Sequence, residues 1–485
     1  MSWLAVLLTL GAYLLVLFVI SYFASRNADN ATFFIGARRT SWYMATLAMI
    51  GAAMSGVTYI SVPGSVLNDS FSYMQMVVGF TIGQLIVAFV LIPLFYKRGV
   101  VSLYQYLDMR YGVMAHRTGA WCFLFAKVVG ASLKVWVVCE VMQLLLFDAL
   151  GVGFVYNVVL TMLLVVLYTL WGGVRSLIMT DILQTLALVA SVVIAIIYLC
   201  DSMGMGFAEL QSAVIDSPYS QMWFFEDSAS PRYFWKMVAG GVLVLVAMTG
   251  LDQDMMQRNM SCRTVRDSQI NIVLTAITQI GVILLFLLLG LLIYKYIDYS
   301  NMPMPTKADD AFALVAVHGG LPLIVGVAFV VGLMSSTYSA AGASLTSLTT
   351  SFTLDIMDGK ERYDDTHLKR VRQRVHIAMA MVICLMVILF DYIANESVIN
   401  MLFTFAGYTY GPILGLFVFG MACKYGIKQR YLPFVVVASP VMSYLLKSVL
   451  AEQFNYYVGF ELLGYNALFT ILGLMLIIKR DENKK

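Results

Sequence analysis

Residues 45–65, ATLAMIGAAMSGVTYISVPGS, read as a membrane-spanning helix that is interrupted near its middle. Most of the side chains are apolar, but Gly51, Gly56, Pro63 and Gly64 are spread along the stretch. Glycine and proline both weaken a helix, although glycine in a membrane helix also eases the packing of neighbouring helices. We expect a break in this helix, with close packing as the alternative explanation of the glycines.

A second stretch of the same kind follows five predicted spans later. In residues 239–259, AGGVLVLVAMTGLDQDMMQRN, Gly240, Gly241 and Gly250 precede Asp252. Two interrupted helices at corresponding positions of two five-helix halves are typical of transporters built from an inverted repeat. Because each half contains five spans, an odd number, the two halves have opposite topologies.

The composition places the chain in a lipid bilayer. Of its 485 residues, 60% are hydrophobic and 12% are charged, and the mean hydropathy is +0.82. This leaves too little polar surface for a water-soluble protein. Apolar runs long enough to cross a hydrocarbon core of ~30 Å as helices recur along nearly the whole length. Because runs such as residues 280–294 show no alternation, we predict an all-α polytopic membrane protein.

Hydropathy predicts about 13 transmembrane helices in one transporter domain, residues 1–485. An extra N-terminal helix, two five-helix repeats and two C-terminal helices make up this domain, over residues 3–22, 42–200, 234–423 and 431–479. If the N-terminus is outside, 24 of the 31 Lys and Arg residues fall in inner segments, as the positive-inside rule requires. The C-terminus is then cytoplasmic, and we expect a multi-pass protein of the plasma (inner) membrane.

Residues 331–352, VGLMSSTYSAAGASLTSLTTSF, contain ten Ser and Thr residues in one predicted helix. Such hydroxyls usually bond to the carbonyl one turn back or let helices pack closely. However, Ser335, Ser336 and Ser339 crowd beside Gly332 within two turns. Together with carbonyls freed by a broken helix, they offer the roughly five or six oxygens that a desolvated Na⁺ requires. We predict a sodium site where this helix meets the first broken helix.

An ionisable side chain inside a membrane span is a functional hypothesis by default. Asp181 lies at a depth where it can meet the predicted sodium site, and we interpret it as a carboxylate beside the cation path. Asp252 either lines a solute cavity or pairs with Arg258. Both acids are therefore candidate functional residues.

Lys127 and Lys134 are seven residues apart and therefore lie on one face of their predicted helix. They either pair internally, with Glu140 or Asp181, or face a cavity and attract an anionic solute. The sequence leaves both possibilities open.

Other chemistries find little support in the sequence. The six cysteines form no CxxC pair, which argues against a disulfide framework or a bound metal. The four histidines lie in predicted loops or at helix ends, and no HExxH or GxSxG motif is present, so we do not expect an enzyme. A proton-coupled symporter of the same fold, with Asp181 or Asp252 as proton carrier, and a non-transporting solute sensor are the alternatives to sodium-coupled transport.

Several motifs resemble those of the sodium/solute symporter family, which carries sugars, amino acids, sialic acid, vitamins and small organic anions. They are FFIGARRTSWYMATLAMIGAAMSGVTYISVPG, LYQYLDMRYG, WGGVRSLIMTDILQ, LDQDMMQRNMSCRTVRDSQ, the hydroxyl-rich helix and GYTYGPILGLF. The resemblance covers nearly the whole chain, and GGxxxxxxTDxxQ and DQxxxQR are its specific parts. It implies a LeuT-like fold of two inverted five-helix repeats, with one helix before them and two after. It also implies alternating-access symport of Na⁺ with a sugar, sialic acid or other organic anion, or less readily an amino acid.

The resemblance also implies particular sodium ligands. By motif position these are three carbonyls and two hydroxyls, from Gly51, Met54, Gly332, Ser335 and Ser336. Asp181 matches an acid that serves sodium coupling, together with Ser339. Because Tyr338 replaces a small hydroxyl of a second sodium site, we expect one Na⁺ per cycle.

Solute-site candidates come from the same matching: Ser55, Thr58, Gln75, Asp252 and, as weaker aromatic candidates, Tyr408 and Tyr410. Tyr73 opens the same span as Gln75 and adds a hydrogen-bonding group. The expected partners are Na⁺, which is also the expected cofactor, a small-molecule solute and the lipid bilayer, without nucleic acid. We expect a monomer to be sufficient for function.

Overall fold

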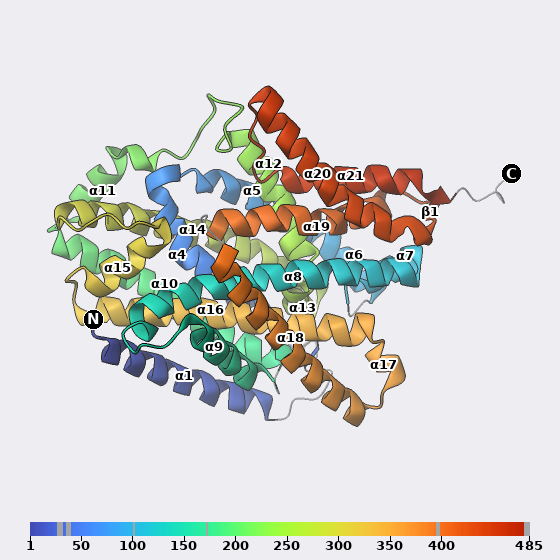
Figure 1. The fold of residues 1–485 in the computed structure, drawn as a ribbon, viewed down its shortest axis with the longest axis horizontal. Helices are drawn as coiled ribbons and strands as arrows, with labels where there is room; N and C mark the ends of the chain where they lie inside the picture. Colours follow the sequence, from blue (N-terminus) through green and yellow to red (C-terminus); the bar gives the residue numbers. More distant parts are fainter. Residues whose placement is uncertain (27–32, 35–39, 100–101, 171–172, 394–397, 480–485) are drawn as a thin grey trace.

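The computed structural model describes the chain apart from residues 27–32, 35–39, 100–101, 171–172, 394–397 and 480–485. Two of the motifs quoted above therefore lie partly outside the described residues, at 35–39 and 171–172. The described part is almost entirely helical, and most of the long helices run roughly parallel to one another (Figure 1).

The elements up to residue 220 include two long helices, α8 and α10, and two π-helical turns, η2 and η3. They are α1 (Trp3–Ser25), α3 (Trp42–Ala53), α4 (Gly56–Asp69), α5 (Tyr73–Ile86), η2 (Val87–Leu91), α6 (Ile92–Arg98), α7 (Gln105–Tyr111), α8 (Val113–Met142), η3 (Gln143–Phe147), α9 (Phe154–Thr169), α10 (Gly173–Ser202), α11 (Phe207–Ile215) and η4 (Pro218–Ser220).

The elements after residue 220 include two more π-helical turns, η5 and η7, and one small antiparallel ribbon in which β1 pairs with β2. They are α12 (Phe234–Leu245), η5 (Val246–Gly250), α13 (Gln253–Met260), α14 (Val265–Tyr299), η6 (Ala308–Asp310), α15 (Ala311–His318), α16 (Leu323–Ser351), η7 (Phe352–Ile356), α17 (Gly359–Arg362), α18 (Asp365–Ile393), α19 (Val398–Ala422), β1 (Gly426–Ile427), η8 (Gln429–Tyr431), α20 (Leu432–Phe454), α21 (Leu462–Leu476) and β2 (Ile478–Lys479).

By length and composition, nine helices of the described chain can cross a membrane, or eleven if two bent helix pairs each count as one span. Two shorter apolar helices, α9 and α21, accompany them. The chain is therefore an all-helical, multi-pass membrane protein.

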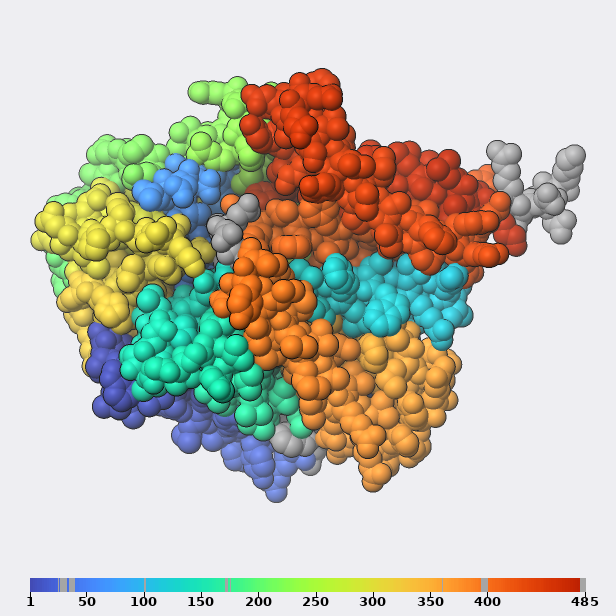
Figure 2. All heavy atoms as spheres, in the orientation of Figure 1, coloured from blue at the N-terminus to red at the C-terminus, as the bar shows by residue number. Residues whose placement is uncertain are grey.

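The hydroxyl-rich helix α16 lies in the interior of the bundle. Its residues from Gly332 to Ser351 are all buried, and it packs against α10, α8 and α3. By contrast, α1 and α20 lie at the edges of the molecule (Figure 2), where many of their apolar side chains are exposed. An apolar exterior around a polar interior is the arrangement that a bilayer requires.

Glycine allows α5 and α12 to pack backbone against backbone. A Cβ atom added at Gly79 would lie 2.3 Å from the carbonyl oxygen of Val238, and one added at Gly241 would lie 2.5 Å from that of Met76. Small residues at helix contacts are the usual means of close approach in membranes.

We predict that Gly79→Ala lowers the stability of the purified protein by about 1–3 kcal/mol, the usual range for overpacking. Gly281→Ala is the matched control, because a Cβ at Gly281 meets no atom within 4 Å. Melting temperatures in detergent measure both effects. Equal melting temperatures for the two variants would contradict the close packing of α5 and α12.

Candidate functional site

The predicted interruption of the first broken helix is present. α3 ends at Ala53 and α4 begins at Gly56, and the two helix axes bend by 57° across Met54 and Ser55. A helix end leaves its last carbonyls without intrahelical partners, and a helix start leaves its first N–H groups unpaired. The break therefore offers carbonyl oxygens and amide donors at the same point.

The second predicted interruption is present as well. α12 passes through the π-helical turn η5 into α13, with a bend of 66°. Asp252 lies at this junction, and its Oδ1 accepts a hydrogen bond of 2.9 Å from the backbone N–H of Asp254. The break thus positions a carboxylate that also caps the helix that follows it.

Glycines bring the first break against its neighbours. A Cβ atom at Gly51 of α3 would lie 2.3 Å from Oγ1 of Thr185 on α10. At Gly56, the first residue of α4, it would lie 3.1 Å from Oγ1 of Thr337 on α16. Close packing and helix interruption, considered above as alternatives, therefore occur together: α3 packs against α10 and α4 packs against α16 on the two sides of the break.

Ser335 stands apart from the neighbouring hydroxyls of α16. Ser336 and Thr337 donate to the carbonyl oxygen of Leu333, at 2.9 and 2.7 Å. Ser335 Oγ is fully buried but makes no hydrogen bond of normal geometry with a described residue, although the hydroxyl of Tyr13 on α1 approaches it. Leaving a buried hydroxyl unsatisfied costs about 1–3 kcal/mol, so this oxygen is available to a ligand.

Asp181 is fully buried on α10 and is paired with partners from two other helices. Its Oδ1 accepts a hydrogen bond of 2.5 Å from Ser339 on α16. Its Oδ2 accepts bonds of 3.2 and 3.1 Å from Nε and Nη2 of Arg258 on α13. The partner cation, which sequence spacing did not reveal, comes from the second broken helix.

A second buried ion-pair group lies beside the first. Lys127 Nζ on α8 lies 3.0 Å from both carboxylate oxygens of Asp252 and 3.0 Å from Oδ2 of Asp254. Asp254 also pairs with Arg258, and the hydroxyl of Tyr410 donates to Oδ2 of Asp252 at 2.6 Å. One continuous network of charged and polar side chains therefore connects the second broken helix with α8, α10, α16 and α19.

These contacts resolve the alternatives for the charged residues. Asp252 pairs with Lys127, while Arg258 pairs with Asp181 and Asp254. The suggested pairing of a lysine of α8 with Glu140 or Asp181 is wrong, because Glu140 pairs with Lys307 at 2.9 Å and Asp181 pairs with Arg258 at 3.1 Å. Sequence reasoning missed Asp254, although its i,i+4 spacing to Arg258 is a recognisable signal for a pair on one helix.

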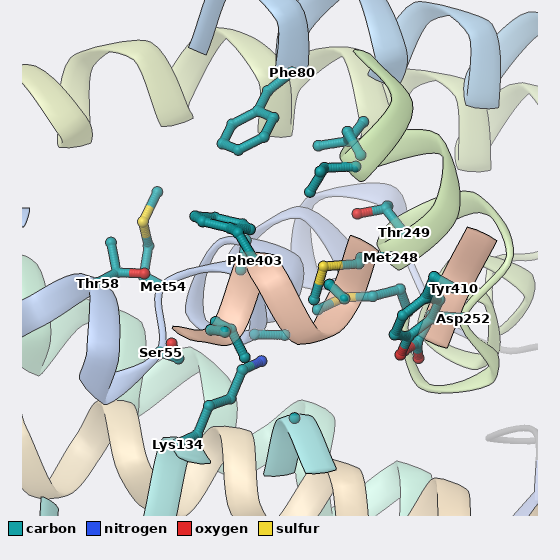
Figure 3. Close-up of a pocket in the computed structure, with 18 of the residues that line it drawn as sticks. Met54, Ser55, Thr58, Phe80, Lys134, Met248, Thr249, Asp252, Phe403 and Tyr410 are labelled. Atoms are coloured by element: carbon teal, nitrogen blue, oxygen red, sulfur yellow. The ribbon is translucent and has the colours of Figure 1, made fainter. Parts of the chain in front are cut away.

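A cavity with a volume of about 110 Å³ lies between the two breaks and is walled by α5, α8, α14 and α19. One enclosed water requires ~10–15 Å³ of such volume, so the cavity has room for roughly 7–11 waters or a small solute. Figure 3 shows the first break on one side and the second break on the other. Five of the predicted solute-site residues line this cavity: Ser55, Thr58, Tyr73, Asp252 and Tyr410.

Two predicted solute-site residues lie elsewhere. Gln75 is buried, but its side chain donates to the carbonyl of Arg232 and accepts from the backbone N–H of Phe224, so it fastens the loop before α12. Tyr408 lines a separate groove formed with α8 and α20, whereas Tyr410 lines the cavity. Two positions along a helix turn a side chain by about 200°, so only one of these tyrosines can face inward.

Lys134 lines the cavity without a partner. Among the described residues it makes no hydrogen bond or ion pair, and Figure 3 shows its side chain extending from α8 into the space between the two breaks. The two lysines of α8 share a face, as predicted, but only Lys127 is held by acids.

The fold, with its two breaks, resembles that of LeuT-like membrane transporters of known structure. Its likeness to a solved Na⁺-coupled sialic acid symporter, in a substrate-bound outward-open state, has a TM-score of 0.80 at 19% identity and covers 98% of this chain and 99% of the other. A family model described as the sodium:solute symporter family matches residues 33–428. The chain belongs to the sodium:solute symporter family.

Its relatives are transporters that are named for different solutes. The human sodium/iodide cotransporter is 25% identical over 82% of this chain and 61% of its own length. A sodium/sialic acid symporter of Proteus mirabilis is 21% identical over 83% of this chain and 81% of its own length. The chain spans between 60% and 66% of the length of three of its relatives.

The two lysines of α8 generate a matched stability prediction. We expect Lys127→Met to destabilise the protein by about 3–5 kcal/mol, because it leaves two buried carboxylates short of a cation. Lys134→Met should leave the melting temperature unchanged or raise it, because it removes a cation without a partner. Thermal unfolding of the purified variants without solute measures the difference. The reverse order of melting temperatures would contradict the ion-pair assignment.

Proposed function

We propose that this protein is a secondary active transporter that carries a small polar solute into the cell together with Na⁺, by alternating access. The observation that supports this most directly is the unpartnered, buried Ser335 hydroxyl on α16, whose neighbour Ser336 lies against the break: a Cβ at Gly56 would lie 3.6 Å from Ser336 Oγ. Family membership supports sodium as the coupling ion.

The proposed sodium site uses neutral oxygens only. Gly51 and Met54 contribute carbonyls from the break, and Gly332 contributes a carbonyl from α16. Ser335 and Ser336 contribute hydroxyl oxygens; Ser336 donates its proton to Leu333, which leaves its lone pairs available to a cation. Neutral hydroxyls and carbonyls suit a hard monovalent cation, because they balance its desolvation without adding a buried negative charge.

Sodium and solute are coupled through the same unwound backbone. Na⁺ bound at Met54 holds the break in one conformation, and Ser55 and Thr58, which follow directly, line the solute cavity. Each ligand then strengthens the binding of the other, since coupling between two sites is reciprocal. A membrane potential of ~100 mV adds about 2.3 kcal/mol for each positive charge moved inward.

We also propose the finer topology. Nine long helices, two bent pairs and two shorter apolar helices supply thirteen segments in the predicted order, as one domain with two inverted five-helix repeats. The positive-inside distribution supports an outer N-terminus and a cytoplasmic C-terminus in the plasma membrane. The complete set of sites within one chain supports a functional monomer.

One Na⁺ per cycle is the stoichiometry that the contacts favour. The Tyr338 ring lies 6.3 Å from that of Tyr13 and 6.1 Å from that of Tyr168, and its backbone carbonyl accepts a hydrogen bond from the Tyr168 hydroxyl. Asp181 is already neutralised by Arg258 and bonded to Ser339. We propose that Asp181 and Ser339 couple α10, α13 and α16 during transport without binding a second cation.

Two alternative functions, proton-coupled symport and solute sensing, predict different experimental results. A proton-coupled symporter would use Asp181 or Asp252 as its carrier, and uptake driven by a pH gradient in the absence of Na⁺ would favour it. A solute sensor would bind without transport, and purified protein in liposomes would then accumulate no solute.

Ser335→Ala is expected to weaken the apparent affinity for Na⁺ by roughly 10-fold or more, because the cation loses one ligand. Na⁺-dependent thermal stabilisation of the purified protein, compared in Na⁺ and choline, measures this affinity. Ser347→Ala is the matched control, because that buried hydroxyl on the same helix donates to the Ser344 carbonyl. Equal Na⁺ affinities in wild type and Ser335→Ala would refute the proposed site.

The dependence of this stabilisation on Na⁺ concentration tests the stoichiometry. Binding of a single ion predicts a hyperbolic curve with a Hill coefficient of about 1 for wild type and for Tyr338→Ala. A sigmoidal curve in wild type would contradict the assignment of one sodium.

A further inference from the structure

The cavity contains a cation that the buried network does not use. Lys127 and Arg258 hold the carboxylates of Asp181, Asp252 and Asp254, and every one of these groups has an ionic partner. Lys134 lines the cavity with no ionic partner among the described residues. Because no carboxylate forms a direct ion pair with it, the Lys134 ammonium is available to bind an anionic group in the cavity.

The start of α4 offers the same anion a second attraction. Ser55 precedes α4 and makes no side-chain cap on it, so the first N–H groups of this fourteen-residue helix are available. The positive end of the helix dipole therefore points into the space toward which Lys134 extends (Figure 3).

Charge counting leads to the same conclusion. With Lys134 protonated, the five buried ionisable groups of the network and the partly buried Lys134 carry three positive and three negative charges. The proposed sodium ion adds one positive charge. A solute with one negative charge restores neutrality in this low-dielectric region, so that cation and solute bind together more readily than either does alone.

A different wall of the cavity carries unsatisfied hydrogen-bonding atoms. Gln84 of α5 donates to Oε1 of Gln279 on α14 at 2.9 Å, but its own Oε1 has no hydrogen-bond partner among the described residues. Thr275 Oγ1, also on α14, likewise has no hydrogen-bond partner among the described residues. Both side chains are at least 97% buried and line the cavity, so they require a ligand with donor groups.

We propose that the solute is a carboxylate that also carries hydroxyl or amide groups. Lys134 and the start of α4 hold the carboxylate, while Gln84 and Thr275 hold the hydroxyl or amide groups. This inference rests on the proposed transport function and specifies its solute. A simple inorganic anion or an unsubstituted aliphatic acid leaves the α5–α14 wall unsatisfied, and a neutral sugar leaves Lys134 unsatisfied.

Matched probes separate these possibilities in binding experiments on the purified full-length protein in Na⁺. Glucuronate and glucose differ in the carboxylate, as do N-acetylneuraminate and N-acetylmannosamine, whereas cyclohexanecarboxylate has the charge without the hydroxyls. We expect glucuronate or N-acetylneuraminate to bind roughly 10-fold more tightly than its own neutral partner. The same acid should bind roughly 10-fold more tightly than cyclohexanecarboxylate and than iodide. The proposal is overturned if a neutral partner, cyclohexanecarboxylate or iodide binds as tightly as both acids. It is also overturned if neither acid binds.

Variants assign the two recognition elements separately. Lys134→Gln should weaken binding of the preferred acid by roughly 30-fold, and Lys134→Arg should restore part of it, because the positive charge returns. Thr275→Val should reduce the preference for that acid over cyclohexanecarboxylate while leaving binding of the latter unchanged. Unchanged binding of the acid by Lys134→Gln would show that the ammonium does not hold it.

Sodium binding, measured on the same samples without solute, distinguishes this inference from the proposed function. If Na⁺ stabilises wild type and Lys134→Gln equally but no acid binds, only the solute assignment fails. If Na⁺ stabilises neither protein, the sodium-coupled function itself fails.

Discussion

A backbone carbonyl or amide that faces hydrocarbon without a hydrogen bond costs several kcal/mol, and this constraint governs the whole structure. A membrane helix can break only where other groups replace the lost bonds. Here both breaks lie inside the bundle, one against the hydroxyls of α16 and the other within a network of charged side chains. The surrounding helices form an apolar shell that allows this polar interior to exist.

The buried ion pairs do more than neutralise one another. Arg258 joins α13 to α10, Lys127 joins α8 to the second break, and Ser339 joins α16 to Asp181. Buried ion pairs contribute little net stability, but removing one partner is costly, so such a network favours a small number of discrete arrangements. A transporter that alternates between two states requires this property, because intermediate positions of the broken helices leave charges unpaired.

Local sequence rules predicted the broken helices and the hydroxyl-rich helix well, because glycine content and hydroxyl crowding are properties of single segments. These rules could not predict the charge pairs, because the paired residues are far apart in the sequence. Arg258 and Asp181 are 77 residues apart, and Lys127 and Asp252 are 125 residues apart, so only the packing of the bundle brings them together. Tyr408 and Gln75 were assigned to the cavity, although neither lines it, because motif position does not define which way a side chain points.

The central claim is that Na⁺ binds where the break between α3 and α4 crosses α16. High-resolution maps of the protein in sodium chloride and in choline chloride test it most directly. The account predicts one additional density feature in sodium, in contact with the carbonyls of Gly51, Met54 and Gly332 and the hydroxyls of Ser335 and Ser336. Identical maps in the two salts, with these five oxygens hydrogen-bonded to protein or water, would contradict it.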